Sequence, residues 1–319
     1  MRPALAAILS LAACPAAGDI SLVLPVDCSL GETCFIQQTV DHDPGPGAAD
    51  FRCGSLSYDG HKGTDVALPS RAAQAAGVTV LAAADGTVRG VRDGQPDVLQ
   101  GSPGAPDVTG VECGNGVVIA HPDGWETQYC HMANGSILVA LGDRITAGTP
   151  LGQVGLSGDS QFPHLHLSVR RDGAVVDPFA PTARDRCGAP DGASLWQNPP
   201  ALPPGGVIAA GIASAVPDFE TIKAGTVPDA AGRDAPLVAW GYLFGTRPGD
   251  VVRLTVTDPA GEAVFTDDVL LERGQAQVFR ATGRRAPPGG WPAGEYLAAV
   301  ALVRDGAALG RQSYRVTLD

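Results

Sequence analysis

The chain has 319 residues, of which 44% are hydrophobic and 18% are charged. This composition is sufficient to bury a core, so it excludes global disorder. The formal net charge is -12 and no basic stripe is present, which excludes nucleic-acid binding as the expected function. No apolar run reaches the roughly 18 residues that cross a bilayer, so we expect no transmembrane helix in the mature chain.

The first residues are typical of an export signal. Met1 and Arg2 form a short positive start, an apolar run follows at 3–13, and small residues come next. Two processing sites compete: cleavage after residue 18, or a lipobox in which residues 1–13 are a lipoprotein signal and Cys14 carries a lipid anchor. Signal length favours the first, and both place the protein in the periplasm or cell envelope.

Residues 19–50 form an N-terminal segment with one strand-like run at 34–40, ended by a Pro-Gly breaker at 43–47. Residues 51–187 alternate short β-type runs with turns, and 70–76 is the best helical window. We therefore expect a mainly β domain with an antiparallel sheet. Its expected strands are 78–82, 87–91, 116–120, 127–131, 150–154 and 164–169.

Residues 188–206 are rich in Pro, Gly and Asn, which is typical of a linker. Residues 207–319 return to β patterning with almost no ionisable clusters. About seven short strands separated by turns predict a C-terminal immunoglobulin-like β-sandwich. Its clearest runs are 237–244, 251–257, 276–280, 296–303 and 313–318. The oligomeric state stays open.

Seven cysteines are present, and an even set of six remains when Cys14 is assigned to the signal or anchor. An even set in an exported chain predicts disulfides, although six cysteines allow 15 connectivities and some thiols could be free and buried. Spacing favours Cys28 with Cys34 and Cys113 with Cys130. Cys53 and Cys187 then remain, and their bond would clamp both ends of the central domain.

Four of the six histidines and one aspartate form the set that carries chemistry. His61 and Asp65 lie four residues apart, and His164 and His166 share one face of a predicted strand because side chains alternate with a period of two. Two nitrogens and one carboxylate oxygen, with a position left open for water, are typical of catalytic zinc. Either motif alone is weak, and their joint occurrence is the stronger signal.

The motifs then follow one another in a recognisable order: HKGTD at 61–65, a hairpin HPDGWETQYCH at 121–131, and PHLH at 163–166. Over residues 52–180 the chain resembles the lysostaphin-type zinc endopeptidases of bacterial cell walls, the LytM-domain family. The resemblance implies one Zn2+ per chain and a peptidoglycan peptide as substrate. It implies that the zinc ligands are His61, Asp65 and His166 and that the catalytic histidines are His131 and His164.

Some positions depart from that pattern or lie beside it. Phe162 stands where the family often has a small residue, and we expect it to lie in the substrate groove with Tyr58. The long loop at 92–110 either rims this groove or is a neutral insertion. His121 matches a hairpin position that we interpret as structural. The triplet at 41–43 is interpreted as turn chemistry rather than as a second metal site or a groove-blocking segment.

These observations predict an exported zinc metalloendopeptidase that cuts peptide cross-links of peptidoglycan. The chain lacks an HExxH helix, so His131 or His164 is expected to take the proton of the attacking water. One alternative is a non-catalytic envelope protein that binds the wall or regulates another hydrolase. Another is a zinc endopeptidase that acts on exported proteins or Gly-rich peptides. The bond cut, an inhibitory role of the N-terminal segment and the role of the C-terminal domain stay open.

Overall fold

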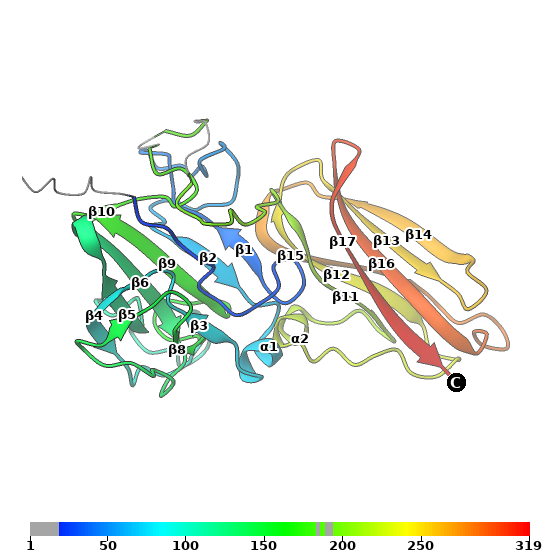
Figure 1. Cartoon of the computed structure of the whole chain (residues 1–319). Coiled ribbons are helices and arrows are strands. Elements are labelled where there is room, and N and C mark those ends of the chain that lie inside the picture. Colours follow the sequence, from blue (N-terminus) through cyan, green and yellow to red (C-terminus); the bar gives the residue numbers. More distant parts are fainter. Residues whose placement is uncertain (1–18, 183–185, 189–193) are drawn as a thin grey trace, which may run out of the picture.

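A computed structural model describes residues 19–182, 186–188 and 194–319 of the chain, and it is mainly β with antiparallel sheets, as predicted (Figure 1). The predicted signal, including Cys14, and residues 189–193 of the predicted linker lie outside the described residues. In the described part, no helix has the length and apolarity needed to cross a membrane.

The first unit is built on an eight-stranded sheet with the order β1-β2-β9-β6-β5-β4-β7, with β10 paired to β9. Its strands are β1 (Phe35–Gln38), β2 (Thr64–Ala67), β4 (Gly86–Arg92), β5 (Asn115–Ala120), β6 (Trp125–Met132), β7 (Arg144–Ile145), β9 (His164–Arg171) and β10 (Ala174–Val175). A two-stranded sheet pairs β3 (Thr79–Leu81) with β8 (Pro150–Gln153). The β9–β10 hairpin turns at Asp172 and Gly173, which both have positive φ, as a tight primed turn requires.

Strand β9 separates the core from the face that bears the histidines. Leu165, Leu167 and Val169 are buried in the apolar core of the first unit. The intervening residues His164 and His166 therefore point to the opposite face, because strand side chains alternate. The buried face of β9 thus fixes the position of the two histidines on its other face.

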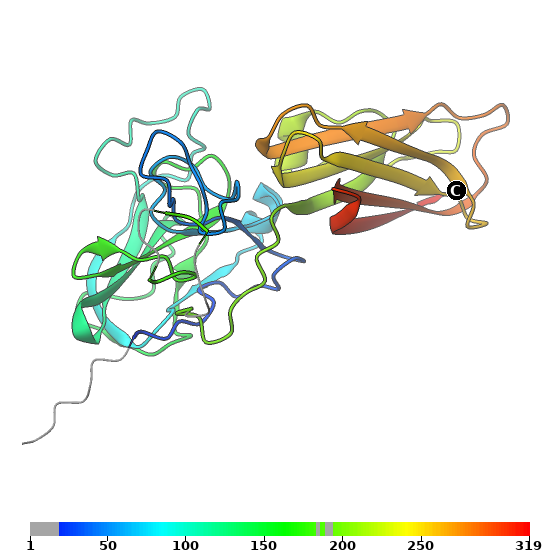
Figure 2. The ribbon, with the colours of Figure 1, turned by 90° about the horizontal axis from the view of Figure 1, so that it is seen from above.

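The second unit contains the predicted number of strands, seven, in two sheets that share one apolar core. The three-stranded sheet consists of β11 (Gly206–Ala213), β12 (Leu237–Thr246) and β15 (Gln275–Arg284), and the four-stranded sheet of β14 (Ala263–Leu270), β13 (Val251–Thr257), β16 (Gly294–Arg304) and β17 (Ala307–Leu318). The immunoglobulin-like assignment stays a prediction. Figure 2 shows the two units side by side.

Two short helices lie where the units meet (Figure 1). Helix α1 (Arg71–Ala75) starts at Ser70, whose hydroxyl accepts the Ala73 amide. Helix α2 (Phe219–Ala224) starts at Asp218, whose carboxylate accepts the Thr221 amide, and ends at Gly225 with φ 74°. A left-handed residue after the last turn favours glycine, so both ends of α2 are encoded locally.

Three disulfides connect the six cysteines, and the pairs are those that spacing favoured. Cys28–Cys34 closes a local loop, Cys113–Cys130 joins the segment before β5 to β6, and Cys53–Cys187 joins residues 134 positions apart. The last bond links the N-terminal and C-terminal edges of the first unit, as expected.

Candidate metal centre

Strands β2 and β9 are neighbours, and their register sets Asp65 opposite His166. His61 approaches from the loop before β2. Gly63 makes this approach possible, since a Cβ atom there would lie 2.6 Å from both His166 Nε2 and the Leu167 carbonyl oxygen. The spacing of the HKGTD motif therefore brings His61 back over the strand that carries Asp65.

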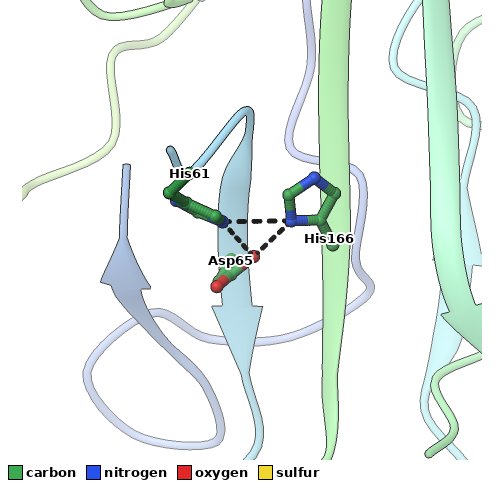
Figure 3. Close-up of side chains that lie close together, drawn as sticks. All are labelled: His61, Asp65 and His166. Atoms are coloured by element: carbon green, nitrogen blue, oxygen red, sulfur yellow. Dashed lines mark hydrogen bonds and ion pairs between the residues drawn. The ribbon is translucent and has the colours of Figure 1, made fainter. Parts of the chain in front are cut away.

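Three donor atoms converge at this point (Figure 3). His61 Nε2 lies 3.2 Å from Asp65 Oδ1 and 3.1 Å from His166 Nδ1, and His166 Nδ1 lies 2.8 Å from Asp65 Oδ1. Tetrahedral zinc ligands at bond lengths of ~2.0–2.1 Å are about 3.3 Å apart, so the separations are close to those a zinc ion needs. The structure thus brings the three predicted ligands together, and it leaves a fourth position without a protein ligand among the described residues.

The outer ring nitrogens of both ligand histidines are tied to protein oxygens. His61 Nδ1 donates to the Thr39 carbonyl oxygen at 2.7 Å, and His166 Nε2 donates to Ser168 Oγ at 3.0 Å, which in turn donates to the Lys62 carbonyl oxygen. In the neutral rings, the inner nitrogens then carry lone pairs that face each other and a carboxylate. Such an arrangement repels itself unless a cation lies between the donors, so the residues present fit a metal ion.

His131 and His164 complete the cluster, with ring centroids 4.6 Å apart. His131 Nδ1 donates to the Ser157 carbonyl oxygen and His164 Nδ1 to the Phe162 carbonyl oxygen, each at 2.8 Å. In both rings Nε2 is therefore left as a proton acceptor, and His164 Nε2 lies 3.7 Å from Asp65 Oδ1. Two oriented imidazoles thus lie beside the three converging donors.

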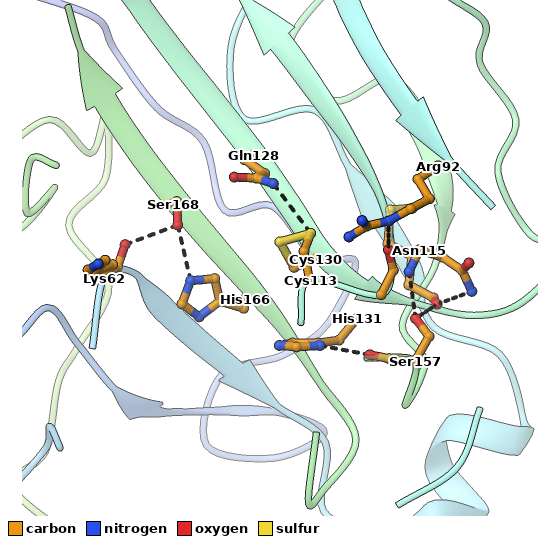
Figure 4. The surroundings of a disulfide bond; sticks show 12 residues. Lys62, Arg92, Cys113, Asn115, Gln128, Cys130, His131, Ser157, His166 and Ser168 are labelled. Atoms are coloured by element: carbon orange, nitrogen blue, oxygen red, sulfur yellow. Dashed lines mark hydrogen bonds between the residues drawn. A yellow bond between two sulfur atoms is a disulfide. The ribbon is translucent and has the colours of Figure 1, made fainter. Parts of the chain in front are cut away.

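The backbone at His131 is itself unusual, because its φ of 61° is uncommon for a residue with a side chain. The β5–β6 register shifts at this position, and the His131 amide donates to the Cys113 carbonyl oxygen at 2.8 Å. The Cys113–Cys130 disulfide lies directly beside it (Figure 4). Backbone strain of this kind persists where the surroundings over-determine the conformation, and here it points an imidazole at the cluster.

The electrostatics of the cluster are strongly perturbed. Burial would raise the pKa of Asp65, but the neighbouring imidazoles of His61, His164 and His166 favour its ionised form and hold the pKa well below its ordinary value. Burial opposes a charge on His61, yet Asp65 outweighs it and the pKa of His61 is raised. For His131 and His164 burial dominates, and it lowers the pKa of both, in His131 by a large amount. Perturbation of this extent is typical of functional sites.

A groove of about 1070 Å³ opens over the cluster, and Asp65, His131 and His164 line it. Tyr58 and Phe162 line it as expected: the Tyr58 ring lies 4.5 Å from that of His61, and the Phe162 ring stacks on His164 at 4.3 Å. Residues 99–103 of the long loop also line the groove, so this loop rims it.

Two further histidines lie outside the cluster. His121 Nδ1 donates to the Asp85 carbonyl oxygen at 2.6 Å, and its Nε2 lies 2.8 Å from Thr127 Oγ1, which fits a structural role. His42 donates to Asp177 at 2.9 Å. The Asp41 carboxylate accepts the amides of residues 43, 49 and 60, and Asp43 Oδ1 accepts the Gly45 amide, so the predicted turn chemistry fits the two aspartates of the triplet, whereas His42 makes a long-range pair.

Several residues that contribute to the site were not predicted from the sequence. Thr39 and Ser157 act through backbone carbonyls, which leave no signature in residue type. Ser168 did carry a signal, because it lies two residues after His166 on the same face of β9. The second unit also contributes to the groove, through α2 and β15, and no local pattern indicated this.

Residues 59–178 match the model of peptidase family M23. The chain contains an M23 peptidase domain. This agrees with the LytM-type resemblance over residues 52–180, and all five residues of the cluster lie inside the matched range. The match covers every strand of the first unit except β1, and the second unit lies outside it.

Two curated relatives share the M23 domain. The DD-carboxypeptidase/endopeptidase Mpg of Neisseria meningitidis is 34% identical over 120 residues, which is 38% of this chain and 22% of that protein. The murein hydrolase activator EnvC of Escherichia coli is 35% identical over 31% of this chain and 22% of that protein. The chain therefore spans about a fifth of the length of these relatives. A mutant catalytic domain of the prophage-encoded M23 protein EnpA from Enterococcus faecalis is 27% identical with a TM-score of 0.31, over 45% of this chain and 88% of that one.

Proposed function

We propose that this protein is an exported zinc metalloendopeptidase that hydrolyses peptide cross-links of peptidoglycan. The observation that carries the proposal is the convergence of His61 Nε2, Asp65 Oδ1 and His166 Nδ1 within hydrogen-bonding distance of one another. Three protein ligands of this type with one open position are characteristic of catalytic rather than structural zinc. When bound, zinc supplies Lewis acidity that activates a water molecule and polarises a carbonyl group.

The chain's own residues would do the remaining work. His61, Asp65 and His166 hold the metal, and Thr39 and Ser168 fix the orientation of the two imidazoles. No glutamate lines the groove near the cluster in the described part of the chain; the one glutamate in the lining, Glu220, belongs to the second unit. A glutamate base of the HExxH type is therefore not available there.

His131 and His164 are the candidates for moving the proton. Each has Nδ1 fixed by a carbonyl oxygen, so each presents Nε2 to the groove as an acceptor. One takes the proton of the attacking water at Nε2 and, as the imidazolium so formed, passes that proton to the leaving amine. The other donates to the oxyanion that develops on the scissile carbonyl when its Nε2 is protonated. The geometry does not divide these two tasks between the rings.

Export and the cell-wall substrate rest on different observations. The N-terminal signal pattern and three disulfides support an oxidising compartment outside the cytoplasm. The relatives named a DD-carboxypeptidase/endopeptidase and a murein hydrolase activator support a peptidoglycan substrate. The second of these names describes activation, but a mere activator has no need of five correctly oriented metal-site and proton-transfer side chains.

The direct test is digestion of purified sacculi by the mature protein loaded with zinc. We expect soluble muropeptides whose masses correspond to cleaved cross-links, and we expect a chelator to abolish them and added zinc to restore them. Stimulation of a separate amidase without release of muropeptides by this chain alone would overturn the proposal in favour of a regulator. Cleavage of Gly-rich peptides with intact sacculi would overturn only the substrate.

A further inference from the structure

The groove over the metal centre has two walls, and they belong to different units of the chain. One wall is the M23 domain, with Tyr58, Phe162 and the loop at 99–103. The other is supplied by the second unit through Phe219, Glu220 and Lys223 of α2 and through residues 275–277 of β15. A ligand in this groove would therefore contact both units at once.

The second wall is fixed in place by packing. An apolar cluster joins the units, with Phe35 and Ala67 from the first and Ile208, Trp240 and Phe244 from the second. The Phe35 and Phe244 rings lie 4.7 Å apart. Burial of this much aromatic surface resists separation of the two units, so the groove keeps its width.

Polar contacts at the groove edge reinforce this junction. Gln277 Nε2 donates to Gln37 Oε1 at 2.7 Å, which links β15 to β1. Arg71 Nη1 of α1 lies 3.5 Å from Glu220 Oε2 of α2. Polar contacts thus connect the two units as well as apolar packing.

The charges of the groove are unevenly divided. Its lining includes the acidic residues Asp65, Asp159 and Glu220, and Lys223 is the one Lys or Arg among the described residues that line it. Lys223 is also one of only two lysines in a chain with a net charge of -12. A cation in this setting is the natural attachment point for an anionic group of a ligand.

The neighbours of Lys223 leave it able to bind an anion. Its Nζ contacts Glu220 Oε1 at 2.5 Å and lies 4.9 Å from the centroid of the Phe219 ring. An ammonium group has three donors, so two remain after the contact with Glu220. Glu220 is shared with Arg71, and the group of three side chains therefore carries a net positive charge.

We infer that the second unit is a substrate-binding wall, and that Lys223 binds a free carboxylate of the peptide while the metal centre cuts the chain. This inference rests on the proposed function, because it assigns part of the same groove. It identifies Lys223 as a specificity-determining residue, and it predicts that the enzyme prefers peptides with free carboxylates to the same peptides with amidated carboxylates.

The test uses the full mature chain, loaded with zinc, and one cross-linked muropeptide prepared in two forms, with free or with amidated carboxylates. For the wild type we expect a KM about tenfold lower for the free form, with similar kcat, because a charge-assisted hydrogen bond contributes to binding. Lys223→Met should remove this preference and Lys223→Arg should retain it. The matched control is Arg253→Met, which removes an ion-paired cation of the same unit at an exposed position of β13 outside the groove, and it should behave as wild type.

The inference is overturned if the wild type does not distinguish the two peptides, or if Lys223→Met keeps the preference. Glu220→Gln sharpens the test, since loss of the competing carboxylate should increase the preference. If the protein cleaves neither peptide, the proposed function fails. Calorimetry with the same two peptides then still tests whether the second unit binds the free carboxylate. Equal affinities in that assay would overturn it independently of catalysis.

Discussion

Two buried aspartates, one in each unit, are compensated in opposite ways. In the second unit, Asp250 is buried and fully paired: it accepts from Arg304 Nε and Nη2, both at 2.8 Å, and from the Arg247 amide. In the M23 domain, Asp65 is equally buried, but its neighbours are imidazole nitrogens that converge on the same oxygen. Asp250 has its charged partner within the protein, whereas Asp65 is arranged to bind a metal ion.

This difference identifies a functional site on physical grounds. Burial of a charge is costly, so evolution retains it where it is compensated. Arg304 compensates Asp250, and the result is structural. At Asp65 the lone pairs of His61 and His166 point at a common centre with the carboxylate, so the compensation requires a cation. All six histidines lie in the first unit and none lies between 206 and 319.

The largest expected effect separates these two aspartates. Asp65→Asn removes a direct zinc ligand, so it should lower both zinc affinity and activity. The loss should exceed the about 10–100-fold that follows when only a hydrogen-bond partner of a ligand is removed. Asp250→Asn should keep zinc and activity but lower the free energy of unfolding by about 3 kcal/mol, because Arg304 is left buried without its partner. Zinc content by elemental analysis, sacculus digestion and denaturant unfolding measure the two effects. The comparison fails if both variants lose the same property.

The second prediction divides the histidines of the M23 domain. His131→Ala and His164→Ala should each retain zinc and lose about 10²–10⁴-fold in turnover, because general acid–base help is removed while the ligands stay. His121→Ala is the matched control from the same hairpin, since His121 contacts Asp85 and Thr127 outside the cluster. Turnover near the wild-type rate in both cluster variants would contradict the assignment of these rings.

Four of the five cluster residues follow simple local rules in the sequence, and the resemblance to the LytM-domain family added His131. The period of two on β9 sets His164 and His166 on one face, and the turn at Gly63 returns His61 toward Asp65. Strand β13 was likewise expected at its observed bounds, 251–257, because a regular alternation of apolar and polar residues marks it.

What the sequence did not predict depends on long-range packing or on the backbone. Helix α2 has six residues, too few for a helical period to appear, and β14 is an edge strand with mostly exposed side chains. The contact of Lys223 with the groove arises from docking of the two units, which no local pattern encodes. The carbonyl oxygens of Thr39 and Ser157 could be supplied by any residue type.

A smaller effect is expected from the support of one ligand. Ser168→Ala removes the acceptor of His166 Nε2 and should lower zinc affinity about 10–100-fold without a change of fold. Ser313→Ala on β17 is the matched control, because Ser313 is an exposed serine on a strand of the second unit. Competition with a fluorescent zinc chelator measures both. Unchanged affinity in Ser168→Ala would mean that the ring of His166 is held by its strand alone.

The smallest expected effect concerns His42, which lies outside the cluster and gives the first unit a buried pair of the kind that Asp250 represents in the second unit. Burial lowers the pKa of His42, but the hydrogen bond and charge of Asp177 outweigh burial, so the pKa is raised above its ordinary value. A raised pKa means that the folded state binds the proton more tightly than the unfolded state. The pair therefore stabilises the fold fully below the unfolded pKa of ~6.5, and this stabilisation is lost as pH rises through the higher folded pKa.

The variant His42→Gln keeps a hydrogen-bond donor but removes the titration. We expect the wild type to exceed it in free energy of unfolding by about 2 kcal/mol at low pH, and by less as pH rises above neutrality, because the charged partner contributes only while protonated. Denaturant unfolding of the zinc-loaded proteins at a series of pH values measures the difference, in which the other titrating groups cancel. Parallel stability profiles would show that folding leaves the pKa of His42 unchanged, and a difference that grows with pH would show that folding lowers it. Either result would mean that the first unit holds no structural ion pair at this position comparable to that of Asp250 and Arg304.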